Sequence, residues 1–393
     1  MPLNILVVVE KNSWLDFHIA DSFEELGHKV VRFNFGEYIS EFYGMSRANE
    51  RLKKNKELLE TAHALQKNSS LDFIFCYVYD DFLLPEYAKA LEALAIPIVN
   101  YNVDMPSQWY RQIKTAKFFT CILCAQPDHM NTIGQYAKKT LYFPMAAKIP
   151  HMSENNSFKK PVLPVTFLGT CLPYRRHLLS ELIRASIPLE IYGKNWKESI
   201  SEHHIRSIEK TCTDLIYYGW PRIKSEGVGS LFRALMSRFK LGEAIDLCIP
   251  DDVLHGPVLN EEILLLFKSS KINLGLTRYA GDDLNRQGRC QMKLRDFEVP
   301  MAGGFYLVEK SPGYELAFED GREIVTWTTL PDLKEKINYY LAHEEEREQI
   351  AKAGQLRAIQ EHSWASRFDM LFAELDIKQA PIKKEVPAIK NES

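Results

Sequence analysis

The chain has 393 residues and a net charge of −3, with 46% hydrophobic and 26% charged residues. This length favours about two domains, and the composition is typical of globular proteins. The charge argues against a nucleic-acid-binding protein, which would normally be clearly basic. The apolar runs are strand-length, well below the roughly 20 residues that span a bilayer, and the N-terminus lacks the pattern of a signal peptide.

Seven cysteines are scattered along the chain. An odd number without regular spacing argues against a disulfide framework and indicates a reducing, cytoplasmic location. Cys121 and Cys124 form a C-x-x-C pair on an expected strand, where residues three apart point to opposite faces. We therefore expect core thiols there, not a zinc or redox site. His203 and His204 lack the i, i+4 spacing of a helix-borne metal site and indicate a solvated helix end.

The first part of the chain alternates strands with helices. Residues 4–9 form a continuous apolar run, typical of a strand buried in a parallel sheet. A helical apolar stripe follows and ends at Gly27, so a β-α-β unit opens the chain. The same reasoning predicts strands at 29–35, 72–79, 96–101, 118–125 and 140–143, and helices at 46–67, 85–94 and 128–138, the last with Asp128 as N-cap. In such a doubly wound sheet, ligands bind outside the carboxyl ends of the strands.

A polar, proline-flanked segment at 148–163 predicts a linker. A second alternation follows it, with strands at 165–168, 189–192, 271–276, 305–308 and 323–326, and helices at 175–185, 260–269, 331–343, 343–361 and 364–375. We expect Rossmann-like domains at 1–147 and 164–362, with a cleft between them. The tail at 378–393 has few apolar residues and predicts disorder.

Residues 221–254 interrupt the second alternation, and within them 230–241 form an amphipathic helix candidate. Basic side chains lie on one face of this helix, and leucine, phenylalanine and methionine lie on the other. Such a helix either packs on its own domain or lies on an anionic membrane surface. The second interpretation would place the protein peripherally at the inner face of the membrane.

Residues 167–176 combine a strand, Gly169 and a helix that begins with Arg175 and Arg176. Backbone N–H groups and guanidinium groups in this arrangement can meet a diphosphate. The alternative is a simple arginine pair on the surface of a helix.

A second glycine loop follows the next strand at 192–196. Gly193, after Tyr192, permits close backbone approach. An aromatic neighbour in this loop, Tyr192 or Trp196, could stack on a nucleotide base. The alternative is an ordinary connecting loop.

The stretch from Lys293 to Glu309 carries the main functional hypothesis. It begins with a charged turn, continues as a short helix ending at Gly303 and Gly304, and finishes as a buried strand. Helix N-termini attract anions because their first N–H groups are unpaired. We therefore expect this stretch to hold the nucleotide end of a sugar donor.

Glu298 lies in an otherwise apolar part of that helix, where a carboxylate must be paired or bind hydroxyl groups. A ribose offers two adjacent hydroxyl donors to such a group. Lys293 and Arg295 lie within one turn and could neutralise phosphates. A purely structural salt bridge between Glu298 and Arg295 is the alternative.

Acidic residues follow strands of the first half. Asp80, Asp81 and Asp104 lie on the sheet edge that would face the cleft. Asp104 precedes an expected helix. It could act as a general base, bind an acceptor hydroxyl, or serve only as a cap or turn former.

A series of ordered motifs runs through the C-terminal part of the chain. They are Arg295-x-Phe-Glu-x-Pro-x-x-Gly-Gly-Phe305, Phe318-Glu-x-Gly321, Tyr339-Tyr-Leu341, Ala351-x-Ala-Gly354 and Glu361-His-Ser-Trp-x-x-Arg367. Together they resemble the CgeB-type, spore-maturation-protein-like glycosyltransferases. Weaker echoes lie at 167–169, 192–196, 255–256 and 271–275, and in the first half at 104–106 and 143–147.

The resemblance implies a GT-B fold, in which the second domain mainly holds a nucleotide sugar and the first holds the acceptor. It also implies that the helix at 363–377 crosses back to the N-terminal domain, and that no metal or other cofactor is needed. In related retaining enzymes a helix-borne glutamate holds the ribose, and Glu298 matches that position. Many of those enzymes have a second glutamate where this chain has Cys290, so retaining and inverting mechanisms both stay open.

The activity implied is that of a hexosyltransferase-like glycosyltransferase, which moves a sugar from a nucleoside diphosphate to a hydroxyl of a glycan, lipid or protein. The alternatives are an epimerase or hydrolase of the same fold, or a non-catalytic nucleotide-sugar-binding protein. Arginine and lysine would stabilise the leaving diphosphate. The implied catalytic residues are Lys293, Arg295 and, in an inverting enzyme, Asp104. The implied donor-binding residues are Gly169, Arg175, Arg176, Tyr192, Gly193, Glu298, Gly303 and Gly304.

Overall fold

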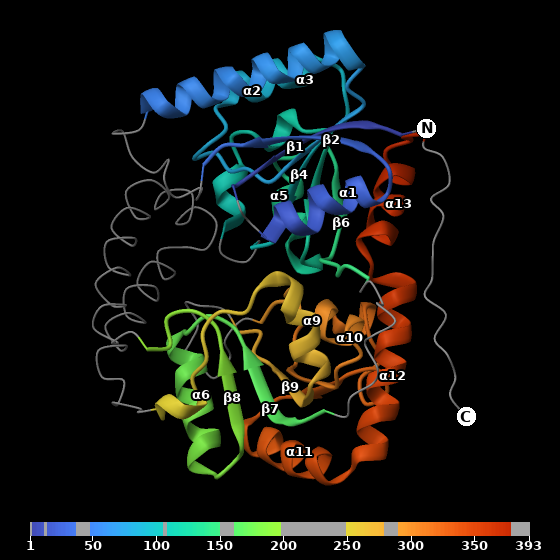
Figure 1. Cartoon of the computed structure of the whole chain (residues 1–393). Helices are drawn as coiled ribbons and strands as arrows, with labels where there is room; N and C mark the ends of the chain where they lie inside the picture. The colour runs from blue at the N-terminus through green and yellow to red at the C-terminus, as the bar shows by residue number, and fades with distance from the viewer. Residues whose placement is uncertain are drawn as a thin grey trace. The chain divides into compact units, whose positions relative to one another are not determined.

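The computed structural model describes residues 2–11, 14–36, 48–104, 108–149, 161–197, 249–278 and 290–378. The described residues form two compact units, each built on a parallel sheet (Figure 1). Unit 1 contains the described residues of Met1–Met145 and those from Trp364 onward, and unit 2 contains those of Ala146–Ser363. The helix expected at 230–241, the His203 and His204 pair, most of the linker and the tail lie outside the described residues.

The unit 1 sheet has the strand order β2–β1–β3–β4–β5–β6, and all neighbouring strands are parallel. Strand β1 (Asn4–Val9) contains a continuous apolar run, and its residues 5–9 are buried, as such a run predicts. The apolar runs therefore predicted these strands correctly, with shifts of one to three residues at several ends. The strands are β1 (Asn4–Val9), β2 (Lys29–Asn34), β3 (Phe73–Cys76), β4 (Ile98–Asn102), β5 (Cys121–Cys124) and β6 (Thr140–Tyr142).

The helices of unit 1 are α1 (Asp21–Glu25), α2 (Ala48–Ser69), α3 (Pro85–Glu92), α5 (Met130–Gly134) and α13 (Trp364–Glu374). A π-helical turn at Asp16–Ala20 leads directly into α1. Gly27 lies shortly after the end of α1 and has a φ of +85°. The prediction of Asp128 as an N-cap is wrong, because it lies in a short turn at Pro127–His129 and His129 precedes α5. No helix in the described ranges has both the length and the apolarity needed to span a bilayer.

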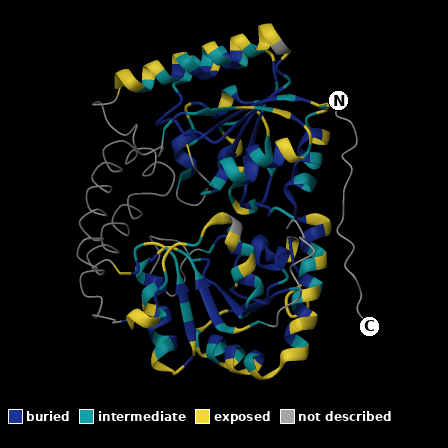
Figure 2. Cartoon of the chain, viewed as in Figure 1, coloured by how far each residue is buried: buried dark blue, intermediate teal, exposed yellow. Residues whose placement is uncertain are grey.

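Helix α13 belongs to the hydrophobic core of unit 1, although it follows all of unit 2 in the sequence. Phe368 stacks on Phe23 of α1 with ring centroids 3.9 Å apart, and Phe372 lies edge-on to Phe73 of β3. The Trp364 indole Nε1 donates a hydrogen bond to Nδ1 of His18 at 3.1 Å. Figure 2 shows the inner strands of the sheet as buried, and the apolar side chains of this helix at Trp364, Phe368, Leu371 and Phe372 are buried as well.

Cys121 and Cys124 lie at the two ends of β5 and are fully buried. Burial raises the pKa of the Cys121 thiol to about 11 and that of Cys124 to about 12. Both thiols therefore stay protonated at neutral pH, and the interpretation as core thiols is confirmed.

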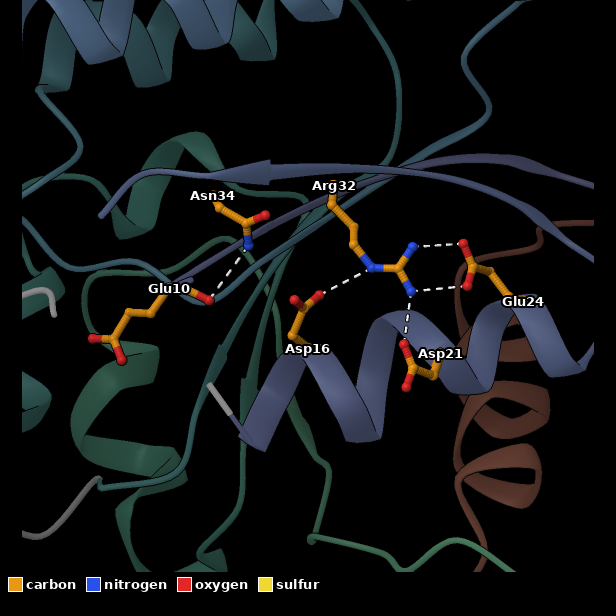
Figure 3. Close-up of polar contacts among 6 residues, drawn as sticks. All are labelled: Glu10, Asp16, Asp21, Glu24, Arg32 and Asn34. Carbon is orange, nitrogen blue, oxygen red and sulfur yellow. Dashed lines mark hydrogen bonds and ion pairs between the residues drawn. The ribbon is translucent and has the colours of Figure 1, made fainter. Parts of the chain in front are cut away.

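The edge strand β2 is fixed to the helical segment before it by one arginine (Figure 3). Arg32 donates to Asp16 at 3.0 Å, to Asp21 at 2.7 Å and to Glu24 at 2.6 Å. Hydrogen bonding by Glu24 raises the pKa of Arg32, so this guanidinium stays charged. An exposed edge strand is open to pairing with other chains, and a charged network of this kind keeps it in place.

The unit 2 sheet has the order β11–β10–β9–β7–β8, again with all neighbours parallel. Its strands are β7 (Leu163–Leu168), β8 (Leu189–Tyr192), β9 (Ser270–Gly275), β10 (Tyr306–Glu309) and β11 (Val325–Trp327). Its helices are α6 (Pro173–Arg184), α9 (Asn260–Lys268), α10 (Arg295–Met301), α11 (Leu330–Ala342) and α12 (Glu344–Glu361). One hydrophobic cluster joins strands β7 to β11 with α6, α11 and α12.

The two sheets share one topology. In each, the first strand lies between the second and the third, and later strands continue outward from the third. The order of winding therefore reverses between β1 and β3 in unit 1 and between β7 and β9 in unit 2. Ligands of doubly wound sheets bind at this point, outside the carboxyl ends of the strands. The prediction of two α/β halves is confirmed.

Candidate functional site

The loops after β7 and β8 meet at two glycines, next to the reversal point of unit 2. A Cβ atom on Gly193 would lie 2.2 Å from the carbonyl oxygen of Gly169, and the φ of Gly193 is +134°. The amide of Gly169 donates to the Tyr192 carbonyl at 2.9 Å, and that of Gly193 donates to the Gly256 carbonyl at 3.1 Å. A close approach of another group to the backbone at Gly193 was expected, and the group that approaches it is the backbone at Gly169.

Trp196 stabilises the close contact between Gly169 and Gly193, which we call the glycine junction. Its side chain is 2% exposed, and its Nε1 donates to the Gly169 carbonyl at 2.8 Å. The hypothesis that Trp196 stacks on a base is therefore wrong, because its ring is part of the hydrophobic cluster. Arg176 donates to the Trp196 carbonyl at 2.5 Å and so supports the same loop.

Arg175 connects the ends of β7 and β9. Its guanidinium donates to the Thr170 carbonyl at 2.9 Å and to the Leu276 carbonyl at 3.4 Å, and it lies 5.5 Å from the Phe167 ring. The side chain is buried. Neither Arg175 nor Arg176 is a simple surface arginine, since both hold loop carbonyls at the carboxyl edge of the sheet.

The start of α10 was expected to attract an anion through its first N–H groups. The amides of Asp296 and Phe297 donate to the carbonyls of Lys293 and Leu294, each at 3.1 Å. The Lys293 amide donates to the Asp296 carboxylate at 2.7 Å. The amides of Asp296 and Phe297 are therefore already used within the first turn, and the role of this stretch in holding the donor stays a prediction.

Glu298 is 4% exposed and forms an ion pair with Arg295. Arg295 remains 32% exposed and lies 5.8 Å from the Phe267 ring. The structure thus shows the salt bridge between these two residues. It also places a partly exposed guanidinium next to the buried carboxylate.

Gly303 and Gly304 set the position of α10 on the sheet. Gly303 ends the helix with a φ of +78°, which favours glycine. A Cβ on Gly304 would lie 2.7 Å from the Asn273 amide nitrogen and 2.9 Å from the Phe267 carbonyl. These glycines therefore let the helix end pack directly on β9 and α9.

Asp296 is a buried carboxyl that sequence reasoning missed. It is 1% exposed and accepts a hydrogen bond from Tyr306 Oη at 2.5 Å. Burial raises the pKa of Asp296 to about 6. The argument used for Glu298, an acid within an apolar helix, also applies to this residue.

A second missed group lies where β9 and β10 end. Glu309 is 3% exposed and accepts from Tyr174 Oη at 2.7 Å and from Arg278 at 2.8 Å. Arg278 also lies over the Tyr174 ring at 4.2 Å, and its carbonyl accepts from Lys293 Nζ at 3.3 Å. Arg278 pairs with Cys290 in an isolated β-bridge, so the place of the absent glutamate adjoins this cluster. The signal for Arg278 was its position in the loop that follows β9.

In unit 1, the side chains of Asp80 and Asp81 bind groups in the loop that follows β4 of the same sheet. Asp80 accepts from the amides of Lys114 and Thr115 at 2.9 and 3.1 Å, and burial raises its pKa to about 6. Asp81 is ion-paired with Arg111, and both side chains are buried. Their placement after β3 was expected, but this burial was not.

Asp104 follows β4 and is partly buried. Its carbonyl accepts from the Gln108 amide at 3.0 Å. Burial, and then the charge of Asp104, raise the pKa of the nearby Tyr77 phenol. The neighbouring Asn102 is fully buried, and its side-chain amide has no hydrogen-bond partner within the described part of the chain. Over the same residues, no group of three or more His, Cys, Asp and Glu side chains is placed to hold a metal.

Comparisons with known proteins agree with this architecture. Residues 222–373 match the family described as glycosyl transferase-like. No curated protein matches the chain by sequence.

Three solved structures illustrate the similarity of fold. HepE of Anabaena in complex with UDP is 13% identical with a TM-score of 0.57, over 95% of this chain and 100% of that one. Sucrose-phosphate synthase of Thermosynechococcus elongatus is 12% identical with a TM-score of 0.56, over 95% and 99%. A glycosyltransferase of Rickettsia africae is 11% identical with a TM-score of 0.59, over 96% and 100%. The chain therefore has the GT-B fold, with a glycosyl transferase-like region at 222–373.

Proposed function

We propose that this protein is a glycosyltransferase that moves a sugar from a nucleoside diphosphate donor to a hydroxyl of a glycan, lipid or protein. One observation carries the proposal. At the reversal point of unit 2, the loops after β7 and β8 meet at Gly169 and Gly193, and arginines line the same sheet edge. The GT-B fold and the glycosyl transferase-like match support this chemistry.

In this proposal the diphosphate of the donor lies at the ends of β7 and β9. Arg278 is 16% exposed and Arg295 is 32% exposed, so both can approach a ligand while their carboxylate partners fix them. Together with Lys293 they would offset the charge that develops on the leaving diphosphate, which is commonly a large catalytic contribution. Glu298 would hold the ribose, with Arg295 compensating its buried charge. Arg175 and Arg176 would act by holding the glycine junction.

The acceptor belongs to unit 1 in this proposal. Asp104, at the end of β4, would remove the proton of the acceptor hydroxyl if the enzyme inverts. UDP-sugars are the first donors to test, because HepE is solved with UDP and with UDP-glucose.

The finer assignments belong to the same proposal. They are membership of the CgeB-type group, a hexose as the transferred sugar, catalysis without a metal, and a cytoplasmic location with membrane contact through 230–241. The resemblance of residues 295–367 to the CgeB-type motifs supports the first of them.

A thermal-shift panel of UDP-, GDP-, ADP- and dTDP-sugars tests the donor site. At least one nucleotide should raise the melting temperature, and Glu298→Ala should abolish that shift. Glu319→Ala is the matched control, because Glu319 also pairs with an arginine three residues away, Arg322, but is exposed. If no nucleotide shifts the wild-type protein, the donor site fails. Release of nucleoside diphosphate only with an acceptor extract supports transfer, and release without one supports hydrolysis.

A further inference from the structure

A histidine and a glutamate form a hydrogen-bonded pair on the edge strand of the unit 2 sheet. Nε2 of His255 lies 2.6 Å from a carboxylate oxygen of Glu190 on β8. The His255 side chain is 38% exposed and that of Glu190 is 29% exposed. This pair is therefore ordered by a short contact while one side of the imidazole remains open to a ligand.

The segment that carries His255 is fixed along β8. The His255 amide donates to the Ile191 carbonyl at 2.8 Å, and Leu254 forms a β-bridge with Ile191. The imidazole stacks on the Tyr192 ring, with centroids 4.5 Å apart and planes at 20°. Tyr192 directly precedes Gly193, so this ring pair adjoins the glycine junction at the carboxyl edge.

The partner of Nε2 determines what the other ring nitrogen can do. A carboxylate only accepts hydrogen bonds, so Nε2 is the donor in this pair. In the tautomer that carries its proton on Nε2, Nδ1 has an in-plane lone pair and is an acceptor. Within the described ranges, Nδ1 of His255 has no hydrogen-bond partner. A ligand that donates a hydrogen bond to Nδ1 of His255 therefore needs an N–H group, such as one in the plane of a flat aromatic ring.

We propose that His255, oriented by Glu190 and Tyr192, selects the base of the donor nucleotide through the ring N–H that uracil, thymine and guanine carry. Cytosine and adenine lack a hydrogen on the corresponding ring nitrogen. This inference rests on the proposed donor site and adds a base preference to it. In this role His255 is a specificity-determining residue, and Glu190 is a positioning residue.

Calorimetric titration of the full chain with UDP and with CDP tests the preference. The wild-type protein should bind UDP at least about tenfold more tightly than CDP, since a mismatched base leaves a polar group unpaired. His255→Phe keeps a flat ring on Tyr192 but lacks the acceptor, so the two affinities should become equal. His255→Asn places an amide oxygen near the Nδ1 position and should restore part of the preference.

A second stacked pair in unit 2 provides the control. His343 stacks on Tyr339 with centroids 3.8 Å apart, at the end of α11. His343→Phe should leave both affinities unchanged. Glu190→Gln should reduce the ratio of the two affinities, because an amide no longer fixes the proton on Nε2.

Different results overturn the inference and the proposed function. Equal affinity for UDP and CDP in the wild-type protein, a preference for CDP, or an unchanged ratio in His255→Phe would each overturn the role of His255 while the donor site stands. If the wild-type protein binds no nucleoside diphosphate at all, the donor site and the base preference both fail.

Discussion

The carboxyl edges of the two sheets hold similar kinds of charged residue in different states. In unit 1, the Asp81 and Arg111 side chains are 6% and 7% exposed, and they hold the loops after β3 and β4 together. In unit 2, Arg295 and His255 pair with carboxylates but remain 32% and 38% exposed. Both edges follow the same strand order. Topology therefore predicts where polar groups gather, whereas exposure separates charges that maintain the fold from charges that can meet a ligand.

The largest expected effect comes from removing the buried cation of unit 1. Arg111→Met removes the ion-pair partner of the buried Asp81 carboxylate, which should cost about 3–5 kcal/mol of unfolding free energy. Arg278→Met is the counterpart in unit 2. It should cost about 2 kcal/mol, since Glu309 keeps its hydrogen bond from Tyr174. Chemical denaturation measures both variants, and equal losses would contradict the difference between the two edges.

The glycine junction of unit 2 should be nearly as sensitive. Gly193→Ala forces a Cβ to within 2.2 Å of the Gly169 carbonyl, and we expect a loss of about 3 kcal/mol together with loss of nucleotide binding. Gly321→Ala is the control, because Gly321 has a φ of +81° and open space around it. It should cost only about 1 kcal/mol. Similar losses would show that backbone strain, and not the loop contact, explains Gly193.

Each unit also contains a buried carboxyl, Asp80 or Asp296, whose pKa burial raises to about 6. A raised pKa contributes stability that is complete below the unfolded value of 3.8 and is lost as the pH rises through 6. For Asp296 this contribution spans about 3 kcal/mol. Asp296→Asn should therefore flatten the dependence of unfolding free energy on pH between 4 and 7 by about that amount.

Asp80→Asn should behave differently from Asp296→Asn. Two amides and the Thr115 hydroxyl converge on Asp80, and one amide oxygen cannot replace both carboxylate oxygens. We expect this variant to lose stability at every pH. An unchanged pH dependence in Asp296→Asn would contradict the assigned direction of the shift.

The smallest expected effect is on two buried tryptophans, Trp196 and Trp364, which each donate one hydrogen bond. Trp196→Phe and Trp364→Phe should each cost about 1 kcal/mol of stability, because the ring stays buried and one hydrogen bond is lost. Only Trp196 contacts the glycine junction. Weaker nucleotide binding is therefore expected for Trp196→Phe alone, and a matching effect in Trp364→Phe would contradict it.

Local patterns predicted the strands and helices well, because apolar runs and helical stripes depend on neighbouring residues. Glu298 was predictable because a carboxylate within an apolar helix needs a partner. Arg278 and His255 were missed because their partners, Glu309 and Glu190, lie 31 and 65 residues away, and folding alone brings each pair together. Asp296 was missed although the argument used for Glu298 applies to it as well.

The wrong interpretations of Trp196, Asp80 and Asp81 have the same cause, which is that their partners are distant in sequence. Trp196 lies in the loop after Gly193, where an aromatic ring was expected to be accessible, but its indole donates a hydrogen bond to the Gly169 carbonyl 27 residues earlier. Asp80 and Asp81 were assigned to an open edge, yet the donors that bury them lie around Arg111 and Thr115, 30 or more residues later. No local pattern contains this information.

Hydrogen exchange with and without UDP tests the central claim most directly, because it reports on the loops of both sheets in one experiment. The account predicts slower exchange in unit 2, in the segments after β7, β8 and β9 around Gly169, Gly193 and Arg278. Protection confined to the loops of unit 1 after β1, β3 and β4 would contradict it.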